Sequence, residues 1–182
     1  MINNKLKKYI FIKNLDEKIK KNIKKLNDVQ IIFNNEHFDS FSLKECIKIK
    51  DFCAKNKIPL YIIDNHKMAL KIKANGIFIS SKNKRINISE FILKKFHVIG
   101  SAHNQLEYYF KKKQKCETIT LSPVFFNPRY SVNKILGIVK FNLISKMWKI
   151  NLCALGGITE KNIKQINLTN ASSVAFQRLI EK

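Results

Sequence analysis

Two consecutive glycines, Gly156 and Gly157, could bind a phosphate group at the end of the apolar run LCALGGI, residues 152–158. Glycine has no Cβ, so its backbone adopts positive φ readily and can bring bare N–H groups against an anion. Thr159 is next, as the expected N-cap of a helix with the sequence TEKNIKQI, and the positive end of that helix would face the same place. A tight turn without a ligand is the alternative interpretation of these glycines.

Two further residues with chemical capability come just after apolar runs. Asp64 follows the run at residues 60–63, where a single carboxylate could bind a hard cation such as Mg²⁺ or cap the next helix. His103 follows the run at residues 96–99, where an imidazole could donate a hydrogen bond to phosphate or cap a helix. We find no Ser–His–Asp or Cys–His set. Other polar residues in comparable positions are Gln30, Asn34, Asn65, Ser81, Asn83, Ser101, Gln177 and Arg178.

The residues named above follow β-prone apolar runs, of which the chain has eight. The runs are mostly continuous rather than alternating, which is typical of strands buried on both faces in a parallel sheet. They are Tyr9–Ile12, Val29–Phe33, Leu60–Ile63, Gly76–Ile79, Phe96–Ile99, Thr118–Leu121, Ile150–Leu155 and Ser173–Phe176.

Segments with helical periodicity separate the runs. Several of them open with a cap-forming residue followed three places later by glutamate, a pattern that satisfies the free N–H groups at a helix start. The expected pairs are Asn14 with Glu17, Ser42 with Glu45, Asn87 with Glu90, and Asn104 with Glu107.

This alternation of strands and helices predicts an α/β fold, a single short (β/α)8 TIM barrel over residues 1–182. Its last helix would be truncated, because the chain stops almost directly after the eighth run. An open doubly wound sheet is the alternative, although the first turn, IKNLDEK, lacks the glycines typical of that fold. In a barrel the polar residues after the runs would meet at the carboxyl ends of the strands, where barrel sites lie.

The chain has a formal net charge of +22, and nearly all of its basic residues are lysine. A basic surface can attract nucleic acid. Here lysine occurs with an excess of isoleucine and asparagine, as in low-GC coding sequences, and it falls mainly on the polar faces of the predicted helices. We therefore favour a solvated surface over a nucleic-acid site.

No apolar run approaches the ~18 residues of a membrane span, and the N-terminal apolar stretch is too short for a signal peptide. We therefore expect a cytoplasmic protein. The four cysteines form no CxxC pair and sit in apolar patterns, so we expect small buried side chains with neither zinc nor disulfides. They are Cys46, Cys53, Cys116 and Cys153.

Four motifs in order resemble the thiamine-phosphate synthase family, which includes the thiazole tautomerases. GSAH at 100–103, LSPVFFNP at 121–128, ALGGIT at 154–159 and SVAFQRLI at 173–180 stand where the family has G-x-S-x-H, G-P-V-F-x-T-x-T-K, A-x-GGI and G-V-A-V-x-S-x-I. Upstream, residues 58–80 are similar to the family's V-P-L-I-I-N-D-R-x-x-L-A-x-x-x-x-A-D-G-V-H-L-G segment, and VQIIF stands where the family has V-Q-L-R. The resemblance covers nearly the whole chain.

The resemblance implies a TIM-barrel transferase that joins hydroxymethylpyrimidine diphosphate to a thiazole phosphate and releases pyrophosphate with the help of Mg²⁺. It implies that Gln30 contacts the pyrimidine and that Asp64 and Asn83 bind the metal. Ser101, which would touch the diphosphate, and His103 form the expected catalytic pair. The remaining phosphate-binding residues would be Asn127, Arg129, Gly156, Gly157, Gln177 and Arg178.

Several family positions carry other residues in this chain, mostly in the half of the site that would bind metal and diphosphate. Arg129 or Lys134 could replace the lysine that follows the family's P-V-F loop. The replacements are Ile32 for the arginine of Q-L-R, Ile63 for the asparagine of N-D, Asn83 for the second metal-binding aspartate, Tyr130 for that lysine, and Arg178 for the serine of the closing motif.

These observations lead to three hypotheses on function. The favoured one is the synthase-like coupling reaction, with small phosphorylated compounds as partners and neither membrane nor nucleic acid. The alternative is a relative that binds thiazole phosphate, either tautomerase-like or non-catalytic, because the metal and diphosphate residues are changed. RNA binding is disfavoured, since the lysines are evenly scattered and no RNA-binding signature is present.

Overall fold

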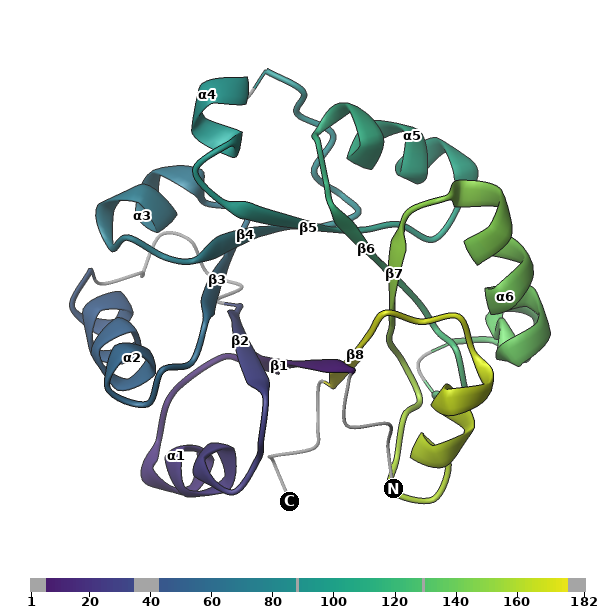
Figure 1. Cartoon of the computed structure of the whole chain (residues 1–182), viewed down its shortest axis with the longest axis horizontal. Helices are drawn as coiled ribbons and strands as arrows, with labels where there is room; N and C mark the ends of the chain where they lie inside the picture. The colour runs from purple at the N-terminus through teal and green to yellow at the C-terminus, as the bar shows by residue number, and fades with distance from the viewer. Residues whose placement is uncertain (1–5, 35–42, 88, 129, 177–182) are drawn as a thin grey trace.

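Eight parallel strands close into a barrel in the computed structural model of the chain (Figure 1). The structure describes residues 6–34, 43–87, 89–128 and 130–176. Each strand pairs with the next one along the chain, and the eighth also pairs with the first, so that Lys8 is opposite both Val29 and Val174. The predicted (β/α)8 barrel is confirmed, because an open sheet would leave its first and last strands apart.

The strands agree closely with the predicted runs. The fifth strand begins one residue and ends two residues later than expected, so it includes Ser101 as its last residue, and the seventh strand is shorter than its run. The strands are β1 (Lys7–Ile12), β2 (Val29–Phe33), β3 (Leu60–Ile63), β4 (Gly76–Ile79), β5 (His97–Ser101), β6 (Thr118–Leu121), β7 (Asn151–Ala154) and β8 (Ser173–Phe176).

Helices surround this ring of strands (Figure 1). Where a helix is expected after β7, the chain forms a turn and then a 3₁₀-helix, and the Thr159 N–H donates to Asn162 Oδ1 at 2.8 Å. Thr159 is therefore not a helix cap. The expected stub of a last helix falls on residues 177–182, outside the described residues. The helices are α1 (Glu17–Lys24), α2 (Leu43–Lys55), α3 (His66–Lys71), α4 (Glu90–Leu93), α5 (Gln105–Lys113) and α6 (Gly137–Trp148), with the 3₁₀-helices η2 (Val132–Lys134) and η3 (Ile163–Leu168).

Helix capping follows the predicted chemistry in part. Asn104 Oδ1 accepts from the Glu107 N–H at 2.9 Å, as expected, but the Glu107 carboxylate accepts from the His103 N–H rather than from Asn104. In α1 the cap is Asp16, whose Oδ1 accepts from the Ile19 N–H at 2.7 Å; Asn14 lies too far from the helix start.

The other two expected caps have different outcomes. Helix α4 begins at Glu90, and the carbonyl of Ser89 accepts from the Ile92 and Leu93 N–H groups. Asn87 is therefore too far before the helix to cap it, and that prediction is wrong. Ser42 lies outside the described residues.

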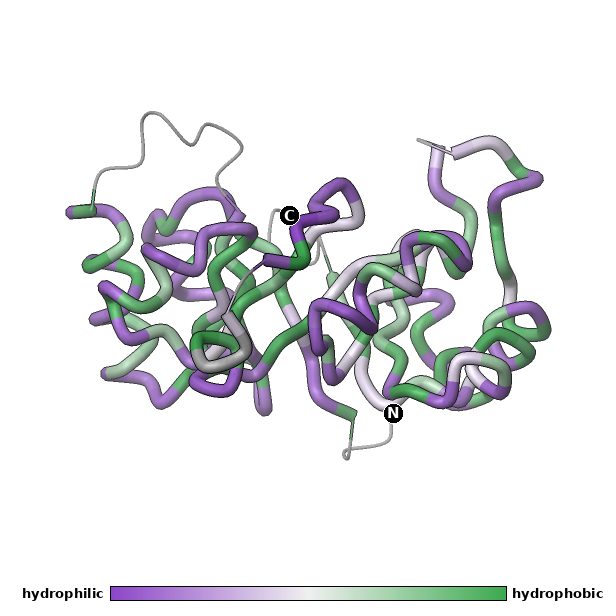
Figure 2. The backbone as a smooth tube through the Cα atoms, turned by 90° about the horizontal axis from the view of Figure 1, so that it is seen from above, coloured by the Kyte–Doolittle hydropathy of each residue, from purple (hydrophilic) through white to green (hydrophobic). Residues whose placement is uncertain are grey.

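Two apolar layers explain why the strand runs are continuous. One fills the barrel, and the other lies between the sheet and the helices. Along the helices the backbone tube alternates between hydrophilic and hydrophobic residues, as expected for elements with one packed face (Figure 2). All four cysteines are buried and free, and no helix among the described residues is long and apolar enough to cross a membrane. The residues that fill the barrel are Tyr9, Ile32, Tyr61, Phe78, Ile99, Cys153, Leu155 and Ala175, with Phe11 and Ile63 against them.

After α2, α3 and α5 the chain passes through a lysine in the left-handed conformation. Lys57, Lys73 and Lys115 have φ values of 55°, 52° and 57°. After α2 the Lys57 N–H donates to Ala54 O at 3.1 Å, and the Ile58 N–H donates to Cys53 O at 2.8 Å. This bonding is the Schellman motif, whose left-handed position usually holds glycine because a Cβ is unfavourable there.

We therefore expect Lys57→Gly to raise the free energy of unfolding by about 0.5–1 kcal/mol, since the relief of left-handed strain exceeds the added entropy of the unfolded chain. The control is Lys55→Gly, in the last turn of the same helix, which should lower it by about 0.5–1 kcal/mol. Urea unfolding of both variants measures the difference. A Lys57→Gly variant as destabilised as Lys55→Gly would contradict this explanation.

Candidate active site at the carboxyl ends of the strands

Asp64 follows β3 directly and reaches across to the end of β4. Its φ is 51°, an uncommon value for a residue with a side chain. Its N–H donates to Phe78 O at 2.9 Å, and its Oδ1 accepts from the Ser80 N–H at 3.0 Å and from Asn83 Nδ2 at 2.8 Å. The cap of α3 is instead Asn65, which accepts from the Met68 N–H. The helix-cap interpretation of Asp64 is therefore wrong.

The two predicted metal ligands, Asp64 and Asn83, are thus neighbours, but they do not present two oxygens to one point. Asn83 donates its amide nitrogen to Asp64, and its Oδ1 accepts from the Arg85 N–H at 3.1 Å. No group of three or more His, Cys, Asp or Glu residues that could hold a metal occurs in the described part of the chain. Because Mg²⁺ in phosphate-binding enzymes needs only one or two carboxylates and takes its other ligands from water and substrate phosphates, Asp64 alone fits such an ion.

Ser101 and His103 lie together at the end of β5. Ser101 is almost fully buried and is paired with Thr120 on β6. His103 is exposed, and its Nδ1 lies 2.9 Å from Ser122 O at the end of β6. A carbonyl only accepts, so Nδ1 carries a proton in this contact and donates it to Ser122 O.

The glycine pair has the positive φ values expected of it, 90° at Gly156 and 71° at Gly157. A Cβ on Gly157 would overlap the carbonyl oxygens of Phe125 and Phe126, in the segment between β6 and α6. The carbonyls of the pair are occupied, because Gly156 O accepts from the Phe125 N–H at 3.0 Å and Gly157 O accepts from Asn162 Nδ2 at 2.7 Å. Within the described residues, no group accepts from the N–H of either glycine. The glycine pair therefore lets the segment at Phe125 and Phe126 pack closely against it, and its two N–H groups can still donate to an anion.

The remaining predicted phosphate ligands are only partly described. Asn127 is half-buried in the segment that packs on the glycine pair, and its carbonyl accepts from the Tyr130 N–H at 2.9 Å. Arg129, Gln177 and Arg178 lie outside the described residues.

Gln30 lies at the opposite end of the barrel from the other predicted residues that the structure describes. It is the second residue of β2, and its Oε1 accepts from the Tyr61 hydroxyl at 2.8 Å. The same hydroxyl is 3.1 Å from Nδ1 of His97, the first residue of β5. Gln30 therefore lies near the amino end of β2 and not at a carboxyl end, and its contact with the pyrimidine stays a prediction. The motif VQIIF is the whole of β2, and three residues at about 3.3 Å each take the strand from Gln30 to its end at Phe33.

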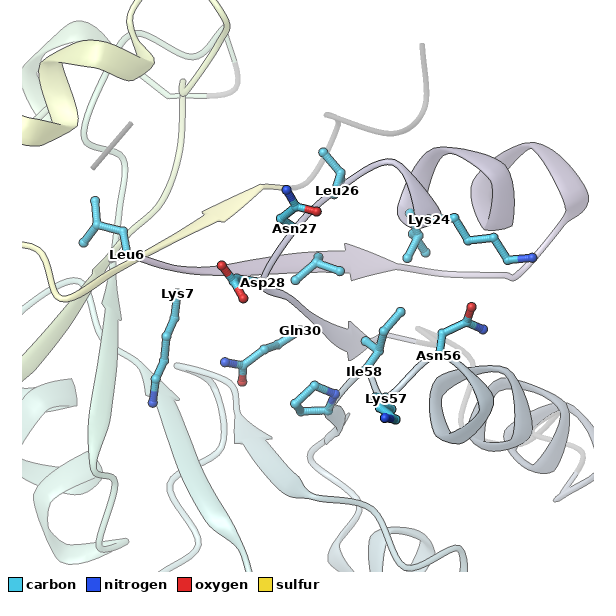
Figure 3. Close-up of a pocket in the computed structure, with 13 residues that line it drawn as sticks. Leu6, Lys7, Lys24, Leu26, Asn27, Asp28, Gln30, Asn56, Lys57 and Ile58 are labelled. Carbon is cyan, nitrogen blue, oxygen red and sulfur yellow. The ribbon is translucent and has the colours of Figure 1, made fainter. Parts of the chain in front are cut away.

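A cavity of about 760 Å³ opens beside Gln30 at the amino ends of the strands (Figure 3). Lys7, Asp28 and Gln30 line it together with Lys57 and Ile58 from the turn before β3. Sites in (β/α)8 enzymes lie at the carboxyl ends, so this cavity is not where we place the chemistry.

Sequence reasoning missed Lys111, a lysine of α5 that is 0% exposed. Its Nζ donates to Ser80 O at 2.6 Å and to Asn83 O at 2.7 Å, in the same segment that holds Asp64. Helical spacing is the sequence signal that could have found it. Lys111 lies three residues after Tyr108 and so on the same face of α5, and Tyr108 stacks on Trp148 of α6.

Cys153 fills part of the barrel interior and has no chemical role there. Burial raises the pKa of its thiol to about 12. The thiol therefore stays protonated at neutral pH, and the protonated form is a poor nucleophile.

Comparison with known proteins identifies relatives that match most of the chain. A family model described as thiamine monophosphate synthase matches residues 11–180. The thiamine-phosphate synthase of Flavobacterium johnsoniae is 32% identical over 160 residues, which cover 84% of this chain and 74% of that protein. The corresponding protein of Flavobacterium psychrophilum is 29% identical over 160 residues, covering 84% of this chain and 77% of the relative.

Among solved structures, a thiamine phosphate pyrophosphorylase from Pyrococcus furiosus is similar in fold. Its TM-score is 0.74 at 18% identity, and the match covers 96% of this chain and 87% of that one. The N-(5'-phosphoribosyl)anthranilate isomerase of the same organism has a TM-score of 0.64 at 14% identity, covering 97% and 90% of the two chains. At 18% and 14% identity, these similarities show a shared fold and nothing more.

The close approach at Gly157 predicts a large effect of a single methyl group. Gly157→Ala should lower the free energy of unfolding by about 3 kcal/mol, because strain at positive φ adds to overlap with two main-chain carbonyls. Gly137→Ala is the control, since Gly137 also has positive φ, at 64°, but a Cβ there meets nothing within 4 Å; we expect about 1 kcal/mol. Equal losses in urea unfolding would contradict the packing role of Gly157.

Proposed function

The chain belongs to the thiamine monophosphate synthase family and is a transferase of thiamine biosynthesis, and on that premise we propose that it joins hydroxymethylpyrimidine diphosphate to thiazole phosphate. In this reaction the C–O bond between the pyrimidine methylene and the diphosphate breaks, and its electron pair leaves with pyrophosphate. The thiazole nitrogen then supplies the electron pair of the new C–N bond. The products are thiamine phosphate and pyrophosphate.

The observation that carries this proposal is the fixed carboxylate of Asp64. Two donors, the Ser80 N–H and Asn83 Nδ2, hold its Oδ1 at the carboxyl ends of β3 and β4. Asp64 would hold Mg²⁺ together with the diphosphate oxygens, and the ion would offset the negative charge that gathers on the leaving group. Asn83 keeps the carboxylate in place.

The glycine pair supports binding of the second substrate. The N–H groups of Gly156 and Gly157, which have no acceptor within the described residues, would donate to the phosphate of the thiazole, and Asn127 lies in the segment packed against them. Ser101, the last residue of β5, and His103, two residues beyond it, would contact the diphosphate. His103 Nε2 can donate to a phosphate oxygen only when the ring is protonated, since Nδ1 is engaged with Ser122 O.

A second candidate function is binding of thiazole phosphate without coupling. It is favoured by two apolar residues, Ile32 and Ile63, which belong to the apolar filling of the barrel. The resemblance to the family places an arginine and an asparagine at these positions. Neither isoleucine can contribute a hydrogen bond to a diphosphate.

The coupling assay distinguishes the two functions. We expect the purified chain to form thiamine phosphate from both substrates in the presence of Mg²⁺, and Asp64→Asn to reduce the rate at least about 100-fold, because loss of one charge-stabilising group typically has that effect. Asp51→Asn, an exposed change on α2, should leave the rate unchanged.

Two outcomes would contradict the proposal. If the wild-type chain binds thiazole phosphate but forms no product at any Mg²⁺ concentration, the binding function replaces the coupling function. If Asp64→Asn is fully active, the carboxylate has no part in the reaction.

A further inference from the structure

Lys111 is a buried cation that has no role in the reaction as proposed. Its Nζ donates to Ser80 O at 2.6 Å, to Asn83 O at 2.7 Å and to Gln114 Oε1 at 2.8 Å. An ammonium group has three protons, so these three bonds use all of its donors. Lys111 therefore has no proton left for a ligand and no access to solvent.

Gln114, one turn further along the chain, extends these bonds. It is 2% exposed, and its Nε2 donates to Asn83 O at 2.9 Å and to Arg85 O at 2.8 Å. Lys111 and Gln114 together bind three carbonyls of residues 80–85, the segment that follows β4. We call these two side chains the α5 clamp.

Burying the charged form of Lys111 in the α5 clamp costs folding free energy. Burial lowers the pKa of Lys111, and no ion pair within the described part of the chain includes this residue. A leucine or methionine would fill the volume without that cost, but it would leave the bound carbonyls without donors.

The neighbouring strand is adapted to the lysine. A Cβ on Gly100 of β5 would lie 2.8 Å from Lys111 Cδ and 2.7 Å from Cys116 Sγ. The methylene stem of Lys111 therefore passes over a strand position where only glycine leaves room.

The residues that the α5 clamp binds are the ones that hold Asp64. Ser80 and Asn83 accept from Lys111 through their carbonyls, while the Ser80 N–H and the Asn83 side chain donate to Asp64 Oδ1. A continuous set of hydrogen bonds thus leads from α5 through residues 80–83 to the carboxylate.

We propose that Lys111 and Gln114 are positioning residues that fix the segment 80–85 so that Asp64 is held in the geometry needed to bind the metal and diphosphate. The part of this inference that concerns the reaction rests on the proposed function. The part that concerns the segment does not, and the two are tested by separate measurements.

The first measurement is hydrogen–deuterium exchange of the whole chain, followed by mass spectrometry. Lys111→Met keeps the stem and removes the three donors, so the amides of residues 80–85 should exchange at least about tenfold faster. Lys112→Met makes the same chemical change at the exposed neighbour on α5 and should leave the exchange of that segment unchanged. Unchanged exchange in a folded Lys111→Met variant would overturn the clamp.

The second measurement is the dependence of coupling on Mg²⁺. Lys111→Met should raise the Mg²⁺ concentration needed for half-maximal rate by about tenfold, as loss of a residue that supports a metal ligand commonly does. The KM for thiazole phosphate should change less than about twofold, because that substrate would bind at the glycine pair. A rise in both quantities together would indicate general damage and overturn the positioning role.

A second variant covers the case in which Lys111→Met does not fold. Gln114→Glu keeps the acceptor for Lys111 but removes the donor to Asn83 O and Arg85 O, so faster exchange should appear around residues 83–85. Unchanged exchange in this variant would also count against the clamp. If the wild-type chain forms no thiamine phosphate, the proposed function fails while the exchange data still decide the clamp.

Discussion

Hydrogen bonds between β1 and β8 close the sheet on itself, and the other features of the molecule depend on that closure. A closed sheet has no free edge, and both of its faces must be covered, one by the side chains that fill the barrel and the other by helices. Closure also brings the ends of eight separate strands into one ring. Residues as distant in sequence as Asp64, His103 and Gly156 therefore lie at the same end of the barrel.

The architecture could be predicted because burial on both faces leaves a strong trace in the sequence. Continuous apolar runs such as LYII and GIFI are short and rich in β-prone residues, which favours buried strands over helices, and a polar residue follows most of them at the strand's end. Both Asp64 and Asn83 are expected at the carboxyl ends for this reason, and the structure places Asp64 directly after β3 and Asn83 in the segment after β4. The positive φ of the glycine pair was predictable because a sharp turn at an apolar strand end leaves few other uses for two glycines.

What the sequence could not reveal depends on contacts between distant segments. The place of Gln30 as second residue of β2 follows from the predicted run Val29–Phe33, but its bond to Tyr61, 31 residues further along the chain, does not. Lys111 belongs to a run of three lysines, which indicates a solvated face until the partners in residues 80–85 are known. Asp16 rather than Asn14 caps α1 because the helix begins at the residue after it, a boundary that periodicity does not define to one residue.

The two ends of the barrel thus differ in character. The amino end is stabilised by bonds among Gln30, Tyr61 and His97, whereas the carboxyl end has the hydrogen-bonded carboxylate of Asp64 and two glycine N–H groups that have no acceptor in the described part of the chain. A structure of the protein with Mg²⁺, pyrophosphate and thiamine phosphate bound tests this assignment most directly. We predict that Mg²⁺ contacts Asp64 and that the product's phosphate accepts from the N–H groups of Gly156 and Gly157. Ligands bound instead in the cavity beside Gln30, with the carboxyl ends empty, would contradict it.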